Sequence, residues 1–243
     1  MTDRDGRSET NTEPLLELCG IRAAYDSIEV VHGIDIAVPP ATVVALLGPN
    51  GAGKSTTLRV ACGLMAPSAG RVLMAGRDVT GIAAEELVRR GVVTIPEGKG
   101  IFPNLTVREN LQMATYAGRS LKDVEEIAYT RFPRLGERRT QLAGTMSGGE
   151  QQMLAMARGL ASSPAVLLLD ELSMGLAPLI VEELYEIVGQ IASEGTSILV
   201  VEQFARTVLG VADVAVIMVH GTIRAVGSPD DIEHQLSAAY LGS

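Results

Sequence analysis

The chain has 243 residues, of which 47% are hydrophobic and 20% charged, a composition typical of a globular protein that excludes a disordered one. Its 29 acidic and 20 basic residues give a net charge of -9, and only 3% of residues are aromatic, so no nucleic acid partner is expected. The two cysteines do not have the spacing of a metal site, so no cysteine-bound metal is expected. No apolar stretch reaches the roughly 18 residues that a membrane-spanning helix needs.

The first elements predicted along the chain are strands. Residues 1–13 are polar and lack the apolar core of a secretory signal, so we expect a flexible cytosolic tail before a single domain over residues 14–243. Strand-like runs follow at Leu15–Leu18, Ile28–Val31 and Ile34–Val38, with turn residues between them. These runs predict a small antiparallel sheet.

A buried parallel sheet is predicted next. Thr42–Leu47 is a continuous apolar run that ends at Gly48, and the helical pattern after it runs from about Gly53 to Gly63. Four similar runs alternate with helical segments, at Val92–Ile95, Val166–Leu169, Ser197–Val201 and Val214–Val219. Strands that alternate with helices indicate an α/β fold with a parallel sheet.

The pattern becomes helical over about residues 96–160, which we interpret as a helical subdomain inserted in the sheet domain. No repeat of 20 to 50 residues and no low-complexity linker is visible beyond the tail. Two capping boxes, each a Ser or Thr with Glu three positions later, predict helix starts: Thr106 with Glu109, opening a helix to Gly118, and Ser147 with Glu150, opening one to about Ala161.

A phosphate-binding loop is predicted at Gly48–Ser55, because GPNGAGKS fits the pattern GxxxxGK[ST] between a strand and a helix. Its glycines let backbone N–H groups converge on an anion at the positive end of the helix dipole. Lys54 would reach the terminal phosphates, and the Ser55 hydroxyl would complete a Mg²⁺ shell. The alternative, an ordinary glycine-rich turn, is disfavoured by the flanking strand and helix.

Two other features bear on phosphate chemistry. Asp170 and Glu171 end an apolar strand. In this position Asp170 would hold Mg²⁺ through water, and Glu171 would polarise the attacking water. An apolar strand that ends in Asp and Glu is commonplace, so a purely structural role is the alternative. Ser147–Glu150, with the sequence SGGE, sets two glycines in a capping box, and its N–H groups would form a second anion site. A simple helix cap is the alternative here.

Three motifs, GPNGAGKST, MSGGEQQ and VLLLDE, resemble in this order the phosphate loop, signature and hydrolysis strand of ATP-binding cassette (ABC) transporter ATPases. The resemblance covers the chain from about Leu15 onward, and it implies ATP hydrolysis with Mg²⁺. It also implies an α/β P-loop NTPase core with a parallel sheet, an N-terminal antiparallel β subdomain and an inserted helical subdomain. More particular segments resemble the LivF-type subunit of branched-chain amino-acid importers, with the urea importer subunit close behind: Pro96–Pro103, Leu176–Val181, Val201–Gln203 and Ala239–Gly242.

The resemblance implies roles for individual residues. Tyr25 matches an aromatic residue that stacks on adenine, with Val31 beside it, and a strand aromatic packed in the sheet is the alternative. The catalytic residues implied are Glu171, Lys54 and Gln203, and those for Mg²⁺ are Ser55, Asp170 and Glu97. The nucleotide-binding residues implied are Tyr25, Val31, Gly48, Asn50, Gly51, Ala52, Gly53, Lys54, Ser55, Thr56, Ser147, Gly148, Gly149 and Glu150.

The resemblance also implies a dimer and a membrane complex. Ser147, Gly148 and Gly149 would meet the γ-phosphate held by a second ABC ATPase subunit, a copy or a paralogue, in a head-to-tail dimer. Further partners would be two transmembrane permease subunits and, indirectly, an extracytoplasmic solute-binding protein. The chain would then be cytoplasmic and peripheral on the inner face of the cell membrane. Ile101–Pro103 would dock a permease helix, unless Phe102 packs inside the helical subdomain.

Five positions depart from the broad family pattern. Glu97 replaces a Gln that senses Mg²⁺, and Gln203, which cannot become cationic, replaces a His. Both replacements resemble LivF-like members, and we expect slower hydrolysis from them. Leu172, Ala177 and Phe204 replace a Pro, an Asp and a polar residue, which leaves communication between the two nucleotide sites open.

The sequence therefore favours an ATPase subunit that powers an importer, with branched-chain or other apolar amino acids as the cargo suggested by resemblance alone. Two alternatives stay open, namely an importer subunit for urea or short amides and a regulatory ATP-binding module with weak hydrolysis. A nucleotide kinase or GTPase would leave Ser147–Glu150 without a role, and the guanine-reading sequence NKxD is absent.

Overall fold

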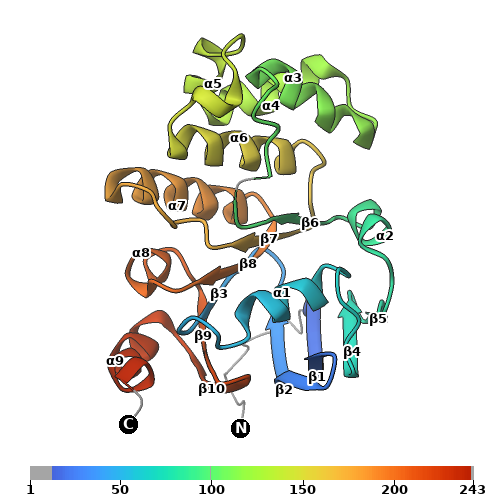
Figure 1. Cartoon of the computed structure of the whole chain (residues 1–243), viewed down its shortest axis with the longest axis vertical. Coiled ribbons are helices and arrows are strands. Elements are labelled where there is room, and N and C mark those ends of the chain that lie inside the picture. Colours follow the sequence, from blue (N-terminus) through green and yellow to red (C-terminus); the bar gives the residue numbers. More distant parts are fainter. Residues whose placement is uncertain (1–12, 99, 242–243) are drawn as a thin grey trace, which may run out of the picture.

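Two β-sheets form the framework of the computed structural model, which describes residues 13–98 and 100–241 (Figure 1). The predicted tail lies outside these residues except for Glu13, as does Gly242 of the C-terminal motif. The smaller sheet confirms the predicted antiparallel pairing, in the order β2-β1-β4-β5. Its strands are β1 (Leu16–Tyr25), β2 (Ile28–Val38), β4 (Ala69–Met74) and β5 (Arg77–Asp78).

The strand β2 is continuous, whereas the sequence predicts two strands separated by a turn. Gly33, at the predicted turn, has a φ of +80°. On either side of it, His32 pairs with Arg22 and Ile34 pairs with Ile21, so Gly33 is an extra residue between two neighbouring pairs. The glycine therefore forms a β-bulge that bends the strand without ending it.

The larger sheet confirms the predicted parallel core, with the described strands in the order β10-β9-β3-β8-β7-β6. Neighbouring strands run parallel except for β10, which pairs antiparallel with β9. Its strands are β3 (Val43–Leu47), β6 (Val92–Ile95), β7 (Val166–Asp170), β8 (Ser197–Glu202), β9 (Val214–Val219) and β10 (Thr222–Gly227). Alternate residues of β3 pack into two different hydrophobic clusters, so this sheet is buried on both faces.

Helices cover both sheets and form a separate group at one end of the molecule, where α3, α4 and α5 lie together (Figure 1). In the residues that the structure describes, no helix combines the length and apolar character of a membrane span. The helices and 3-10 turns are α1 (Lys54–Ala61), α2 (Ala84–Arg89), α3 (Val107–Gln112), η1 (Met113–Ala117), α4 (Leu121–Arg131), α5 (Pro133–Glu137), η2 (Ala143–Thr145), α6 (Gly148–Leu160), α7 (Pro178–Ser193), α8 (Ala205–Leu209) and α9 (Pro229–Leu241).

Both predicted capping boxes are present, at the starts of α3 and α6. The helix that starts after Ser147 ends as predicted, with Ala161 as its C-cap. The helix that starts after Thr106 does not stay α-helical to Gly118, because it becomes the 3-10 turn η1 at Met113. Gly118 ends that turn with a φ of +93°. The glycine therefore marks the end of the helical segment as predicted, but the last turn before it is a 3-10 turn and not α-helix.

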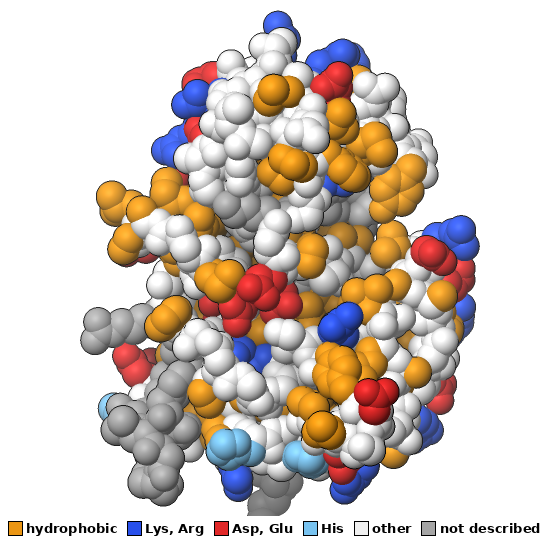
Figure 2. Space-filling view, viewed as in Figure 1, with side chains coloured by type: hydrophobic (Ala, Val, Ile, Leu, Met, Phe, Trp, Pro, Cys, Tyr) orange, Lys and Arg blue, Asp and Glu red, His pale blue; other side chains and the backbone are white. Residues whose placement is uncertain are grey.

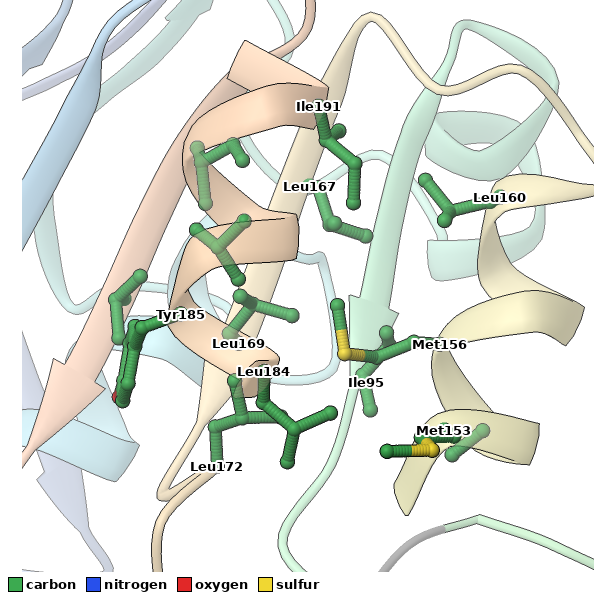
Figure 3. Close-up of a cluster of buried hydrophobic side chains, with 14 of the residues drawn as sticks. Ile95, Met153, Met156, Leu160, Leu167, Leu169, Leu172, Leu184, Tyr185 and Ile191 are labelled. Atoms are coloured by element: carbon green, nitrogen blue, oxygen red, sulfur yellow. The ribbon is translucent and has the colours of Figure 1, made fainter. Parts of the chain in front are cut away.

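The helices α6 and α7 pack on the same side of the parallel sheet, α6 nearest β6 and α7 nearest β8 (Figure 3). Met153 and Met156 of α6, Leu184 of α7 and Leu169 of β7 belong to one buried cluster. Leu172, which replaces the Pro of the family pattern, is 1% exposed and belongs to this cluster. The apolar contact fixes the segment after β7 and the N-terminal parts of α6 and α7.

Because β3, β8, β7 and β6 are parallel neighbours, their carboxyl ends lie at one edge of the sheet. Gly48 follows β3, and Glu97 follows β6 by two residues. Glu171 follows β7 directly, and Gln203 follows β8 directly. The edge therefore carries most of the residues singled out in the sequence, as expected for ligand sites in open α/β sheets.

Candidate nucleotide-binding site

The loop between β3 and α1 is held in shape by two glycine contacts. Gly53, the N-cap of α1, has a φ of +105°, and a Cβ atom there would lie 2.8 Å from the Cε atom of Met218. The N–H of Gly221 donates a hydrogen bond of 2.8 Å to the carbonyl of Ala52. The backbone of the loop therefore wraps closely around the start of α1, with its N–H groups at the positive end of the helix.

Lys54 lies inside this loop and is only 4% exposed. Its Nζ atom donates hydrogen bonds to the carbonyl oxygens of Gly48, at 3.0 Å, and Pro49, at 3.2 Å. Burial lowers the pKa of the ammonium group, while the carboxylates of Glu171 and Asp170 act in the opposite direction. The cation is thus held in a fixed position beside two carboxylates.

A pocket of about 150 Å³ opens at the N-terminus of α1. Glu171 from the end of β7 lines it together with the phosphate loop, so the structure brings these two predicted features together. Ala52 is buried and, like Gly48, can contribute only backbone atoms to a ligand. The lining residues are Val30, Asn50, Gly51, Gly53, Lys54, Ser55, Thr56 and Glu171.

The predicted Mg²⁺ residues include one direct pair. The Ser55 hydroxyl lies 3.5 Å from Oδ1 of Asp170. Burial, with the neighbouring charges of Glu171 and Glu97, raises the pKa of Asp170 to about 6, although Ser55 and Lys54 oppose the shift. Acidic side chains also gather near the centre of the face shown in Figure 2.

Oxygen ligands of this kind suit Mg²⁺, which binds few protein carboxylates and completes its shell with water and substrate phosphates. Within the described ranges, no group of three or more His, Cys, Asp or Glu side chains could hold a metal ion by itself. Ser55 and Asp170 therefore fit an ion that arrives with a nucleotide better than an ion held by the protein alone.

Glu171 occupies a strained backbone position between β7 and the following loop. Its φ is +47°, in the left-handed region that a residue other than glycine seldom adopts, and its N–H donates a 2.9 Å hydrogen bond to the carbonyl of Val201. Burial raises the pKa of the Glu171 carboxyl, Lys54 opposes the shift, and Glu97 and Glu202 add to it. The carboxylate lining the pocket is thus more basic than an ordinary Glu side chain.

The two residues predicted to contact adenine differ in their placement. Tyr25 is 43% exposed, and its hydroxyl lies 3.4 Å from the Thr56 hydroxyl, next to the phosphate loop, so it is not the packed strand aromatic of the alternative interpretation. Val31 is fully buried, and the structure corrects this prediction because its side chain points into the core. Val30, the preceding residue on β2, lines the pocket instead.

The second predicted anion site lies at the start of α6. Ser147 accepts a hydrogen bond from the N–H of Glu150, while the Glu150 carboxylate accepts hydrogen bonds from the N–H and hydroxyl of Ser147. Arg138 lies 2.7 Å from the same carboxylate. Burial opposes ionisation of Glu150, but Ser147 and Arg138 together hold its pKa below the usual value. The Glu150 carboxylate is therefore engaged in the cap and with Arg138, and the part of this residue in nucleotide binding stays a prediction.

Gly149 has a packing role in addition to any ligand role. A Cβ atom at this position would lie 2.4 Å from Cγ2 of Ile180, so α6 and α7 approach each other closely at their N-terminal ends.

None of the residues from Ser147 to Glu150 is among the described residues lining the pocket at Lys54. Figure 1 shows α6 in the upper half of the view and α1 in the lower half. The two anion cradles of one chain thus lie apart.

Several predicted positions remain at the surface. Glu97 is exposed, Gln203 is half-buried, and Phe204 is 69% exposed. Phe102 is 43% exposed, with the Arg158 guanidinium 4.8 Å from the centre of its ring, so it is not enclosed in the helical subdomain. Ala177 is the N-cap of α7 and provides no side-chain hydrogen bond there.

Two residues of the site, Val30 and Glu202, are not among those predicted from the sequence. Regular alternation counted back from the buried Ile34 would turn Val30 inward, but the bulge at Gly33 shifts the buried face to Val31, so Val30 could not be found without that bulge. Glu202 ends β8 next to the strand that ends in Asp170, and the rule used for Asp170 applies to it equally. It is 1% exposed and acts on the pKa values of both Lys54 and Glu171.

Comparison with known proteins decides the family. Residues 31–173 match the family described as ABC transporter. The chain belongs to the ABC transporter family. A high-affinity branched-chain amino acid transport ATP-binding protein, BraG of Pseudomonas aeruginosa, is 40% identical to this ABC chain, over 93% of the chain and 95% of the relative. A probable branched-chain amino acid transport ATP-binding protein, LivF of Archaeoglobus fulgidus, is 32% identical over 91% and 95%.

The fold agrees with this assignment to the ABC ATPases. A crystal structure of the ADP conformation of an ATP-binding cassette of an ABC transporter superposes with a TM-score of 0.85 and 26% identity. The superposition covers 96% of this chain and 100% of the other. The predicted resemblance and fold class are confirmed, and the chain is an ATP-binding subunit of the ABC transporter type.

Proposed function

We propose that this ABC ATPase hydrolyses ATP to power an importer for branched-chain or other apolar amino acids. The observation that carries the hydrolytic part is the pocket in which the phosphate loop and the Glu171 carboxylate meet. The cargo rests on the named transport roles of the two relatives at 40% and 32% identity. These roles extend to the present chain as part of the proposal.

Nucleotide binding would use the loop and its lysine. The N–H groups at the start of α1 and the Lys54 ammonium would hold the phosphates, and the half-exposed Tyr25 ring would stack on the adenine. Ser55 and Asp170 would hold a Mg²⁺ ion, with Glu97 acting through water. When bound, the ion would supply positive charge to the terminal phosphates.

Hydrolysis would depend on Glu171. Its carboxylate lines the pocket, and its raised pKa makes it a better proton acceptor for an attacking water than an ordinary Glu side chain. Gln203 would assist by hydrogen bonding alone, since an amide cannot become cationic. The negative charge of Glu97 near Asp170 and Glu171 opposes the build-up of charge on the phosphate, which accounts for the slower hydrolysis we expect.

A complete site would need a second subunit. The start of α6 presents helix N–H groups, yet Ser147 and Gly148 do not line the pocket that Lys54 occupies. Two ATPase subunits arranged head to tail would bring the Ser147 helix of each one to the γ-phosphate held by the other. Either a second copy of this chain or a related ATPase would satisfy this arrangement.

The membrane part of the complex would come from other chains. Two transmembrane permease subunits would carry the solute, supplied by an extracytoplasmic solute-binding protein, with this subunit peripheral on the cytoplasmic face of the membrane. The exposed Phe102 and the adjoining Pro103 would form part of the surface that meets a permease helix. The solute would then be selected by these partners and not by this subunit.

The hydrolytic role is tested by steady-state ATPase assays on two variants. Glu171→Gln should bind ATP as tightly as the wild type but lose at least about 100-fold in kcat, in the range typical of general-base catalysis. Lys54→Ala should lose at least about tenfold in ATP affinity, because a hydrogen bond to a charged group contributes about 1.5–3 kcal/mol. Lys122→Ala, at an exposed lysine of α4, is the matched control. Wild-type turnover by Glu171→Gln would reject its role as the base.

The cargo is tested with the permease subunits that co-purify with the chain. Reconstituted in vesicles with their solute-binding protein, they should drive ATP-dependent uptake of leucine, isoleucine or valine, with uptake lost in Glu171→Gln. Uptake of urea or short amides instead would favour the second importer hypothesis. ATP binding without measurable turnover or permease partners would favour a regulatory module.

A further inference from the structure

Glu202 is a buried carboxylate at the functional edge of the sheet. It is the last residue of β8, is 1% exposed, and pairs in register with Leu47, the residue before the phosphate loop. Its Oε1 atom accepts hydrogen bonds from the N–H of Ser173, at 2.9 Å, and the hydroxyl of Tyr185, at 2.5 Å. Its Oε2 atom accepts one from the Ser173 hydroxyl at 2.8 Å. Hydrogen bonds of this number and quality stabilise a buried charge.

The segment that Glu202 holds is the one that carries Glu171. Ser173 lies two residues after Glu171, and the intervening Leu172 is anchored in the apolar cluster. The N–H of Glu171 itself donates a hydrogen bond to the carbonyl of Val201, which also lies on β8. The segment is therefore attached to β8 at two residues, Glu171 through its backbone and Ser173 through Glu202.

This attachment explains how a strained residue stays in place. The left-handed backbone of Glu171, with a φ of +47°, persists only if its surroundings enforce it. Tyr185 brings α7 into the same network, because its buried ring lies on the β8 side of that helix (Figure 3) and its hydroxyl donates to Glu202. Glu202 thus joins β8, the loop after β7, and α7 at one point.

We propose that Glu202 is a positioning residue for ATP hydrolysis, which through Ser173 fixes where the Glu171 carboxylate points. The inference rests on the proposed role of Glu171 as the base. A displacement of about 1 Å in a catalytic group can cost on the order of 100-fold in rate. Such a residue acts on kcat and leaves nucleotide binding unchanged, because Ser173 does not line the phosphate pocket.

Two variants separate the reach of Glu202 from its charge. Glu202→Asp keeps the charge but shortens the side chain, so it cannot hold Ser173 in the same place. Glu202→Gln loses the charge but keeps the reach, because its amide oxygen can still accept from the Ser173 N–H and the Tyr185 hydroxyl while its NH₂ donates to the Ser173 hydroxyl. The steady-state kcat, the KM for ATP and the affinity for ATP are measured for both variants.

The positioning role predicts that Glu202→Asp loses at least about tenfold in kcat, with KM and ATP affinity within about twofold of the wild type. Glu202→Gln should stay within about threefold of the wild-type kcat. A Gln variant as slow as the Asp variant, or slower, would contradict positioning and point to the charge instead. Wild-type kcat in both variants would overturn the inference as well.

Two further measurements cover folding and coupling. If Glu202→Asp does not fold, Ser173→Ala takes its place and should lose about threefold or more in kcat with unchanged ATP affinity; wild-type kcat there would overturn the inference. In a Glu171→Gln background, Glu202→Asp should leave the residual rate unchanged, because the residue acts through Glu171. A further fall of tenfold in that background would indicate a structural role. Glu186→Gln, on the exposed side of α7, is the matched control.

The inference and the proposed function fail in different ways. A wild-type chain that binds ATP without cleaving it, alone and with its partner subunits, contradicts both. A wild-type chain that hydrolyses ATP through Glu171, with Glu202→Asp equally fast, contradicts only the positioning role of Glu202.

Discussion

At the scale of single residues, the site is dominated by carboxylates facing one lysine. Asp170 and Glu171 both influence the buried Lys54, and Glu97 adds a further negative charge. The carboxyl of Asp170 has a pKa of about 6, against an ordinary value of 3.8. Without a bound cation, this charge is unfavourable in the folded state at neutral pH.

The stability of the nucleotide-free chain should therefore depend on Asp170 and on pH. Between pH 3.8 and about 6 the folded state binds a proton at Asp170 more tightly than the unfolded state, so this residue lowers the free energy of unfolding as the pH rises. Asp170→Asn should raise the melting temperature by about 2–4 °C at pH 8, the shift that about 1 kcal/mol produces in a chain of this size. Thermal unfolding without nucleotide or divalent ions measures it.

The same variant should gain less at pH 5, where the wild-type carboxyl is mostly protonated in the folded state. Glu186→Gln, at an exposed residue in the middle of α7, is the control for a simple change in net charge. A melting temperature that Asp170→Asn leaves unchanged or lowers at pH 8 would show that Asp170 is not under electrostatic strain.

Residue patterns predicted the backbone of the site better than its side-chain contacts. The loop at Lys54 and the carboxylate at Glu171 could be placed together because strand ends of a parallel sheet converge. Val31 was misplaced by one position, since a resemblance does not say which face of β2 turns inward. The place of Glu202 at a strand end was predictable, but its hydrogen bonds to Ser173 and Tyr185 were not, because they join segments that are distant in the sequence.

At the scale of helices and strands, helix starts recur at functional positions. The starts of α3 and α6 have complete capping boxes, whereas Ala177, the N-cap of α7, has no capping side chain. The backbone of Ala177 already has the extended geometry of an N-cap, with φ -69° and ψ 144°. The start of α7 is therefore less stabilised than its neighbours by local hydrogen bonding.

Ala177→Asp should raise the free energy of unfolding by about 1 kcal/mol, because the carboxylate would accept hydrogen bonds from the first turn and interact with the helix dipole. Urea unfolding of the nucleotide-free chain measures the change. Ala177→Leu, which cannot cap, should not be stabilised. Equal stability of the Asp variant and the wild type would show that the start of α7 gains nothing from a cap.

The existence and order of the main elements followed from the sequence, but some boundaries did not. Continuous apolar runs predicted the parallel strands because both faces of that sheet are buried. Gly33 was misinterpreted as a turn because a bulge and a turn use the same backbone freedom. The change from α3 to η1 at Met113 has no signal in the residue types, since tertiary packing decides the last turn of a short helix.

At the scale of the whole molecule, the two helix starts proposed to bind phosphate, those of α1 and α6, lie apart within one chain. The pocket of the Lys54 loop contains no described residue from the start of α6. Because the Lys54 loop and the start of α6 lie apart, neither of them alone can make all the contacts that one triphosphate needs. Under the proposed function, two chains in opposite orientation would complete both sites at once, and ATP would then join the subunits.

The most direct test is the structure and solution mass of Glu171→Gln with ATP and Mg²⁺, measured alone and mixed with any ATPase subunit that co-purifies with it. We predict a complex of two subunits, twice 25.6 kDa for two copies of this chain, with each triphosphate held between Lys54 of one subunit and the helix that begins at Ser147, or its equivalent, of the other. A nucleotide-loaded monomer under both conditions, with Ser147 facing solvent, would contradict the account.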